Sequence, residues 1–219
     1  MQLVFNWHIT EACNYSCCYC FARWGRPREI WKNSTVCDRL FTELSKFSSL
    51  DSCKKIFEDR SVSNIRINFV GGEPLLLGES LITIIDRVVC EFGFSASIVT
   101  NASLLEGCLD ILENIETIGI SIDSFATDTN RLIGRAACCK DVLSGKDYKR
   151  IINLVRNRNP EIKVKVTSVV SEHNCGEELL KDIDALAPDR VKVFRQLPFE
   201  GNKGITDEMF DSFIVNNVI

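Results

Sequence analysis

The chain has 219 residues, 45% of them hydrophobic, and a formal net charge of −4. This length suits one domain with a substantial core, so we expect a single domain over residues 1–219. The acidic balance argues against non-specific nucleic-acid binding, and no apolar run is long enough to predict a membrane-spanning helix. We therefore expect neither a nucleic-acid partner nor a membrane anchor.

Short β-rich runs alternate with helical patterns along the whole chain. The predicted strands are Leu3–Ile9, Ile65–Val70, Ser97–Thr100, Thr117–Ile122, Ile162–Val169 and Arg190–Gln196. The predicted helices are Val36–Phe47, Leu81–Glu91, Leu104–Ile115, Tyr148–Asn157 and Glu177–Ala187. Such alternation predicts a parallel sheet with crossover helices. Six units favour an α/β fold, specifically a partial (β/α)6 barrel of the TIM type.

Four of the eleven cysteines fall within eight residues, directly after the first predicted strand. Cys13, Cys17 and Cys20 have the spacing C-x3-C-x2-C, which lets one loop supply three thiolates to an iron–sulfur cluster. Three ligands for four irons leave one iron open. A structural zinc ion completed by Cys18 or His8 is the alternative interpretation. The other cysteines are scattered and no signal peptide is found, so we expect a reducing, cytoplasmic location.

The predicted strands carry a second signal, because side chains alternate between the two faces of a strand. In the second strand, Ile65, Ile67 and Phe69 share one face and leave Arg66 and Asn68 on the other. We expect the apolar face to pack beneath the helices and the polar face to point into the barrel. The same rule gives an inward set of four cations: Arg66, Lys165, Arg190 and Lys192.

These inward cations call for a compensating anion, because burying unpaired charge is unfavourable and an ordinary barrel interior is apolar. A polyphosphate supplies both the negative charge and the acceptor oxygens. Alternatively, the cations belong to exposed strand ends or pair with Asp123 and Glu73. Four cations from three strands favour the anion site.

The cysteine loop, followed by the aromatic Phe21, resembles the cluster loop of the radical S-adenosylmethionine (SAM) enzymes. Gly71-Gly72-Glu73-Pro74, directly after the second predicted strand, is similar to their GGEP motif, whose backbone pairs with the SAM amino group. Both motifs in this order favour a cluster over zinc. The resemblance implies a 4Fe–4S cluster on Cys13, Cys17 and Cys20, with SAM on the open iron.

The same resemblance suggests which residues contact SAM. The candidates are Gly71, Gly72, Glu73, Pro74, Thr100, Asn101, Ser121, Asp123 and Arg135. Ser121 and Asp123 could equally cap loops. Arg135 could meet the SAM carboxylate or a phosphate, or lie on the surface as an ordinary loop arginine.

Five further motifs carry a closer resemblance. They are Asn6-Trp7-His8-Ile9-Thr10, Ile120-Ser121-Ile122-Asp123-Ser124-Phe125, Leu132-Ile133-Gly134-Arg135, Lys192-Val193-Phe194 and Glu200-Gly201-Asn202. Together they resemble the viperin family of radical SAM nucleotide dehydratases, from about Leu3 to Phe213. The resemblance implies nucleotide contacts by Asn6, Arg66, Lys165, Thr167, Arg190 and Lys192. Arg66 stands where that family leads us to expect lysine, and Thr167 where we expect asparagine, so the preference among CTP, UTP and GTP does not carry over.

The resemblance also implies a reaction. Viperins convert a ribonucleoside triphosphate to its 3′-deoxy-3′,4′-didehydro form, an antiviral chain terminator. The 4′ hydrogen is abstracted, the 3′ hydroxyl leaves as water, and one further electron completes the alkene. We therefore expect a reductase, flavodoxin or ferredoxin as electron donor. A radical SAM enzyme with another substrate, or an inactive protein that binds the cluster and nucleotide, is the alternative. Because viperins continue past the stretch that resembles this chain, we expect their C-terminal lid to be missing or shortened here.

Overall fold

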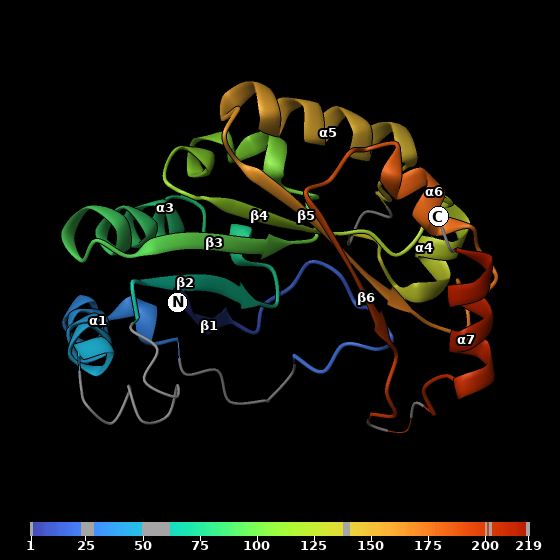
Figure 1. The fold of residues 1–219 in the computed structure, drawn as a ribbon, viewed down its shortest axis with the longest axis horizontal. Coiled ribbons are helices and arrows are strands. Elements are labelled where there is room, and N and C mark those ends of the chain that lie inside the picture. Colours follow the sequence, from blue (N-terminus) through green and yellow to red (C-terminus); the bar gives the residue numbers. More distant parts are fainter. Residues whose placement is uncertain are drawn as a thin grey trace.

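The computed structural model describes residues 2–22, 29–49, 62–137, 141–199, 201 and 203–217. Within these residues, six strands form one sheet in the order β1-β2-β3-β4-β5-β6. The strands are β1 (Gln2–Thr10), β2 (Asn64–Gly71), β3 (Ser95–Thr100), β4 (Thr117–Ser121), β5 (Lys163–Val170) and β6 (Arg190–Arg195). Every neighbouring pair is parallel. The predicted partial barrel is confirmed, and Figure 1 shows its strongly twisted sheet, with β6 crossing in front.

Helices lie around the sheet (Figure 1). Those that match predicted helices are α1 (Ser34–Ser49), α3 (Glu79–Asp86) with its π-helical continuation η3 (Arg87–Glu91), α5 (Gly145–Arg158) and α6 (Leu179–Asp184). Helices α4 (Thr127–Ile133) and α7 (Asp207–Asn216) were not predicted, nor were the short 3-10 turns η1 (Ile30–Lys32) and η2 (Pro74–Leu77). No described helix is long and apolar enough to cross a membrane.

The helix predicted over Leu104–Ile115 is wrong. Two short 3-10 segments occupy it, η4 (Leu105–Gly107) and η5 (Leu109–Glu113). The segments are separated at Cys108, whose φ of −134° and ψ of 32° are not helical, directly after a glycine that disfavours a helix interior. The apolar side chains of Leu105, Ile111 and Leu112 are still buried, so they pack against the sheet without a continuous helix.

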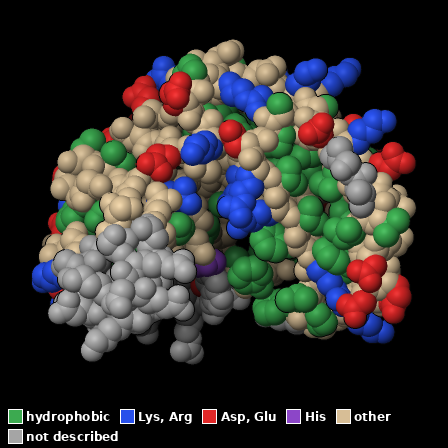
Figure 2. All heavy atoms as spheres, viewed as in Figure 1, with side chains coloured by type: hydrophobic (Ala, Val, Ile, Leu, Met, Phe, Trp, Pro, Cys, Tyr) green, Lys and Arg blue, Asp and Glu red, His purple; other side chains and the backbone are tan. Residues whose placement is uncertain are grey.

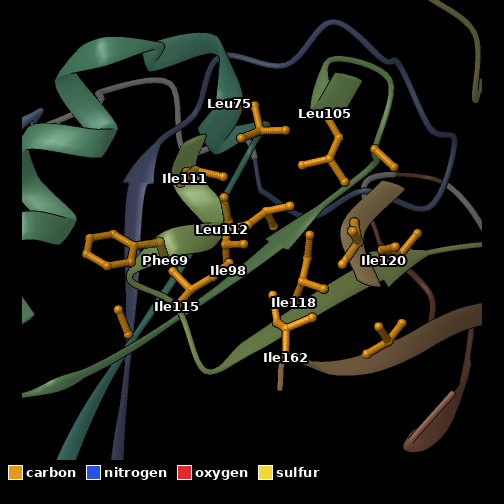
Figure 3. Close-up of a cluster of buried hydrophobic side chains, with 14 of the residues drawn as sticks. Phe69, Leu75, Ile98, Leu105, Ile111, Leu112, Ile115, Ile118, Ile120 and Ile162 are labelled. Carbon is orange, nitrogen blue, oxygen red and sulfur yellow. The ribbon is translucent and has the colours of Figure 1, made fainter. Parts of the chain in front are cut away.

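The core lies between the sheet and its helices. Ile65, Ile67 and Phe69 on β2 are each at most 4% exposed, as the alternation of faces predicted. In Figure 3 such strand residues meet side chains from η2, η4 and η5. Burial of each large apolar side chain contributes about 1.5–3 kcal/mol, so this layer is a main source of the stability of the fold. The opposite face of the strands is therefore left for polar residues.

Candidate functional site

The loop that carries Cys13, Cys17 and Cys20 is held from two sides by backbone hydrogen bonds. On one side Gly72 N donates to Thr10 O at 2.8 Å and Glu73 N to Ala12 O at 2.8 Å. A Cβ on Gly72 would stand 2.1 Å from Ala12 O, so no larger residue fits this approach. The GGEP segment thus packs directly against the start of the cysteine loop.

The end of α4 holds the other side of the loop. Ser16 N donates to Gly134 O at 3.0 Å, and Cys18 N donates to Ile133 O at 2.9 Å. Gly134 ends α4 in the left-handed conformation, with a φ of 88°, and a Cβ there would stand 2.3 Å from Ser16 O. Only glycine combines this conformation with this contact.

The three predicted cluster ligands lie within electrostatic reach of one another. Burial is the main cause that raises the pKa of the Cys17 thiol to about 11, and Cys20 and Cys13 add to it. Tyr15 N donates to Cys13 Sγ at 3.4 Å, a contact of the kind that tunes cluster-bound sulfur. None of the described cysteines forms a disulfide. Cys18 is exposed, and its role stays a prediction.

Glu73 of the GGEP motif is fully buried and joins β2 to the end of β3. Its Oε1 accepts from Leu75 N at 3.0 Å and from Thr100 Oγ1 at 2.8 Å, and its Oε2 accepts from Asn101 N at 2.7 Å. Burial raises the pKa of Glu73, against the lowering effect of these donors. Asn101 also donates to Asn14 Oδ1 at 2.8 Å, which ties β3 to the cysteine loop. Asn101 Nδ2 also lies 4.0 Å from Cys13 Sγ, so four predicted site residues, Glu73, Thr100, Asn101 and Cys13, come together.

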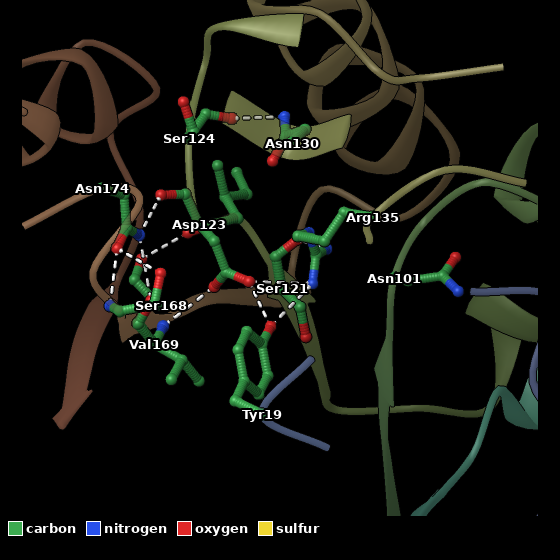
Figure 4. A network of polar contacts seen from close by, with 12 residues as sticks. Tyr19, Asn101, Ser121, Asp123, Ser124, Asn130, Arg135, Ser168, Val169 and Asn174 are labelled. Atoms are coloured by element: carbon green, nitrogen blue, oxygen red, sulfur yellow. Dashed lines mark hydrogen bonds and ion pairs between the residues drawn. The ribbon is translucent and has the colours of Figure 1, made fainter. Parts of the chain in front are cut away.

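Asp123 and Arg135 form a buried ion pair at 3.2 Å. Figure 4 shows both side chains converging with Tyr19 of the cysteine loop. The Tyr19 hydroxyl donates to Asp123 Oδ2, and Asp123 Oδ1 accepts from Val169 N at 2.8 Å. Arg135 donates to Ser121 O at 2.6 Å, and its side chain is only 4% exposed. The alternative of a surface arginine is therefore wrong, and the roles of Ser121, Asp123 and Arg135 toward SAM stay predictions.

The four predicted inward cations gather on the face opposite the core. Lys165 pairs in register with Arg190 and lies across from Gly119. Its stem covers that glycine, since a Cβ on Gly119 would stand 3.2 Å from Lys165 Cε. The pKa of Lys165 is lowered, first by burial and then by the positive charges of Lys192, Arg66 and Arg190. Figure 2 shows Lys and Arg side chains gathered in the middle of the face viewed.

None of these four cations forms a salt bridge with a described carboxylate. Arg66 Nε is also buried and finds no hydrogen-bond partner within the described ranges. The predicted alternative, pairing with Asp123 and Glu73, is wrong because those carboxylates bind other groups. Arg190 alone is exposed, at the first position of β6. The cluster thus carries uncompensated positive charge.

The remaining predicted nucleotide residues also lie on this inner face. Thr167 pairs in register with Lys192, and Asn6 pairs with Asn68. In the motif Glu200-Gly201-Asn202, positions 200 and 202 lie outside the described residues. Tyr19, Gly119 and Gly134 were not assigned roles from the sequence. The sequence did offer two signals: Tyr19 is an aromatic residue among the cysteines of the loop, and Gly119 is a glycine inside a strand, which often marks a close approach of another group.

Comparison with known proteins shows the family to which the chain belongs. A family model described as the radical SAM superfamily matches residues 7–186. The S-adenosylmethionine-dependent nucleotide dehydratase of Fibrobacter sp. (strain UWH6) is 40% identical, over 99% of this chain and 62% of that protein. The protein of the same name from Psychrobacter lutiphocae is 33% identical, over 97% of this chain and 71% of that protein. The chain belongs to the radical SAM nucleotide dehydratase family.

The fold of this dehydratase family member also resembles that of solved radical SAM structures. The crystal structure of Streptococcus suis SuiB bound to S-adenosylmethionine superimposes with a TM-score of 0.63 at 17% identity, over 98% of this chain and 47% of SuiB. At this identity the likeness concerns the fold alone.

Membership of the superfamily implies a 4Fe–4S cluster and SAM as cofactors, and the residues present fit them. Three free thiols from one clamped loop are the donors that iron prefers, and a backbone N–H already faces one of the sulfurs. Within the described part of the chain, no three His, Cys, Asp or Glu side chains converge enough to hold one metal ion. A cluster binds each thiolate at a different iron, so its ligands need not converge on one point.

Proposed function

We propose that this chain is a radical SAM dehydratase that converts a ribonucleoside triphosphate to its 3′-deoxy-3′,4′-didehydro analogue. The observation that carries the proposal is the cluster of Arg66, Lys165, Arg190 and Lys192, which has no carboxylate partner among the described residues. A triphosphate supplies the missing negative charge and offers acceptor oxygens to every one of these donors. The names of the dehydratase relatives agree with a nucleotide substrate.

The strand direction orients such a nucleotide. Arg66 lies five residues before Gly71 on β2, which is about 16 Å at the rise of a parallel strand. The phosphates would sit beside the cations in the first half of the strands. The sugar would then lie toward the carboxyl ends, where the cysteine loop and the GGEP segment are found. This is also the end at which barrel enzymes hold their reacting groups.

Each part of the chain has a separate task in this proposal. When bound, the cluster and SAM supply a carbon radical able to remove hydrogen from the sugar. Cys13, Cys17 and Cys20 would hold the cluster, and the segment around Glu73 would seat SAM. The cations fix the triphosphate on rigid strands, so the protein contributes mainly orientation. Removal of the 4′ hydrogen, departure of the 3′ hydroxyl as water and uptake of one electron leave the alkene.

The proposal is tested by anaerobic incubation of the reduced, reconstituted protein with SAM and each of CTP, UTP and GTP. Mass spectrometry should find one nucleotide that has lost a water, with 5′-deoxyadenosine formed alongside. Cys17→Ala, which removes a ligand, should lose the brown chromophore and both products. Cleavage of SAM without any change to the nucleotides would contradict the proposed nucleotide substrate. A protein with an intact cluster that never cleaves SAM would contradict the proposed enzymatic activity.

A further inference from the structure

A polar row crosses the inner face of the first three strands. Asn6 on β1, Asn68 on β2 and Ser97 on β3 occupy aligned positions in the parallel register. Asn68 Nδ2 donates to Asn6 Oδ1 at 2.8 Å, and Ser97 Oγ donates to Asn68 Oδ1 at 2.8 Å. Ser97 is buried, whereas Asn6 at the other end of the row is exposed. The row therefore leads from the buried interior to an open surface.

The direction of these hydrogen bonds decides what Asn6 presents. An asparagine amide has one acceptor oxygen and two donor hydrogens on nitrogen. Asn68 Nδ2 donates to the Asn6 oxygen. Asn6 Nδ2 makes no hydrogen bond to any described group. The amide nitrogen of Asn6, with both hydrogens unused, is thus the end that offers more to a ligand than the oxygen, which already accepts one bond. A donor there suits an acceptor oxygen of a phosphate or a sugar.

The row adjoins the cation cluster. Arg66 lies two residues before Asn68 on β2, so both side chains leave the same face of the strand. Asn68 itself spends both ends of its amide on Asn6 and Ser97. Both bonds go to neighbouring side chains, which is the pattern of a residue that orients a neighbour.

We propose that Asn68 and Ser97 are positioning residues, which hold the Asn6 amide with its nitrogen toward the bound nucleotide. This inference rests on the proposed function, because it takes the ligand to be a ribonucleoside triphosphate. Ser97 fixes the Asn68 amide, and Asn68 fixes the Asn6 amide. Each neutral hydrogen bond of this kind is worth about a twofold to twelvefold change in an equilibrium.

A double-mutant cycle tests the relay. The full chain, reconstituted with its cluster, is titrated calorimetrically with CTP, UTP and GTP, and the tightest nucleotide is used for the variants. Asn6→Ala and Asn68→Ala should each weaken binding about tenfold, and Ser97→Ala somewhat less. The Asn6→Ala, Asn68→Ala double variant should bind no more weakly than Asn6→Ala alone. Such non-additivity is the signature of residues that act as one unit.

Additive losses would overturn the relay, because they would mean that Asn68 contacts the nucleotide itself or only supports the strand. Asn6→Asp tests the orientation: it keeps an acceptor for Asn68, removes the donor and adds a negative charge that repels a phosphate, so binding should fall more than in Asn6→Ala. Retained binding would mean that Asn6 presents its oxygen. Asn153→Ala on the outer helix α5 is the matched control and should change nothing. A wild-type chain that binds none of the three nucleotides would overturn the proposed function and the relay together.

Discussion

At the residue scale, Lys165 illustrates the stability cost of the proposed anion site. Its ammonium group is partly buried beside three other cations, without a carboxylate partner among the described residues. Such an arrangement is unfavourable until an anion arrives, which is typical of binding sites. Its apolar stem nevertheless packs on Gly119, so the repulsion comes from the charge and not from poor packing.

Lys165→Met should therefore stabilise the nucleotide-free protein, because the substitution keeps the stem and removes the charge. The Tm should rise by a few degrees at neutral pH, since 1 kcal/mol corresponds to about 2–4 °C at this size. The folded-state pKa of Lys165 is lowered, so the repulsion is fully present below that pKa. The gain should shrink as the pH rises through that pKa toward 10.5, where the unfolded lysine also loses its proton.

The same variant should lose the increase in Tm that a triphosphate gives to the wild-type protein. Differential scanning calorimetry with and without nucleotide measures both effects. Lys149→Met on the exposed face of α5 removes an equal charge and should alter neither. A nucleotide-free Lys165→Met protein that melts below the wild type would mean that Lys165 has a stabilising partner.

Gly119→Ala is expected to disturb binding without disturbing the fold. The new Cβ would stand 3.1 Å from Val99 Cγ2 and 3.2 Å from Lys165 Cε, and the flexible lysine is the group that can yield. Triphosphate binding should weaken about fivefold, as for the loss of one favourable contact. Stability should change little, because removal of a glycine that weakens the strand offsets the tight contact with Val99. Titration calorimetry measures the binding, and thermal melting measures the stability. An unchanged affinity for the triphosphate would contradict the proposed contact between Lys165 and the nucleotide.

At the element scale, the cysteine loop depends on what flanks it. The GGEP segment holds its beginning, the end of α4 holds its middle, and Tyr19 joins it to the Asp123–Arg135 pair. The loop itself has no regular secondary structure between β1 and residue 22. Its three thiols are therefore positioned by neighbouring elements. A change at the end of α4 should reduce the amount of cluster that the loop binds.

Gly134→Ala tests this dependence. The added methyl group would stand 2.3 Å from Ser16 O and 3.3 Å from Cys17 Cα, so the loop must move. Anaerobic reconstitution should give clearly less iron and sulfide per chain than the wild type. Gly93→Ala is the matched control: its φ of 66° carries a similar conformational cost of about 1–2 kcal/mol, but a Cβ there meets nothing within 4 Å. Equal iron content in both variants would contradict the role of α4.

Features that depend on neighbouring residues in the sequence were predictable, and features that depend on contacts between distant residues were not. The strands and the inward cations were predictable because a period of two is visible in six or eight residues. The helix over Leu104–Ile115 failed because apolar spacing was weighed without the break at Gly107. The buried pair of Asp123 and Arg135 with Tyr19 was not predictable, since Tyr19 and Asp123 are 104 residues apart and meet only in the folded chain.

At the scale of the whole molecule, a chain with a net charge of −4 concentrates positive charge on the inner face of its sheet. The apolar faces of the same strands build the core with the surrounding helices, so one alternation of side chains produces both the core and the proposed binding surface. The parallel order of the strands brings the cysteine loop, the GGEP segment and the end of β3 to one edge.

The most direct test of this arrangement follows a deuterium atom. The reduced, reconstituted protein is incubated anaerobically with SAM and a ribonucleoside triphosphate that carries deuterium at the 4′ carbon. If the cations hold the sugar beside the cysteine loop, the deuterium should appear in 5′-deoxyadenosine while the nucleotide loses one water. Unlabelled 5′-deoxyadenosine with an intact, fully deuterated nucleotide would contradict the proposed site and its substrate.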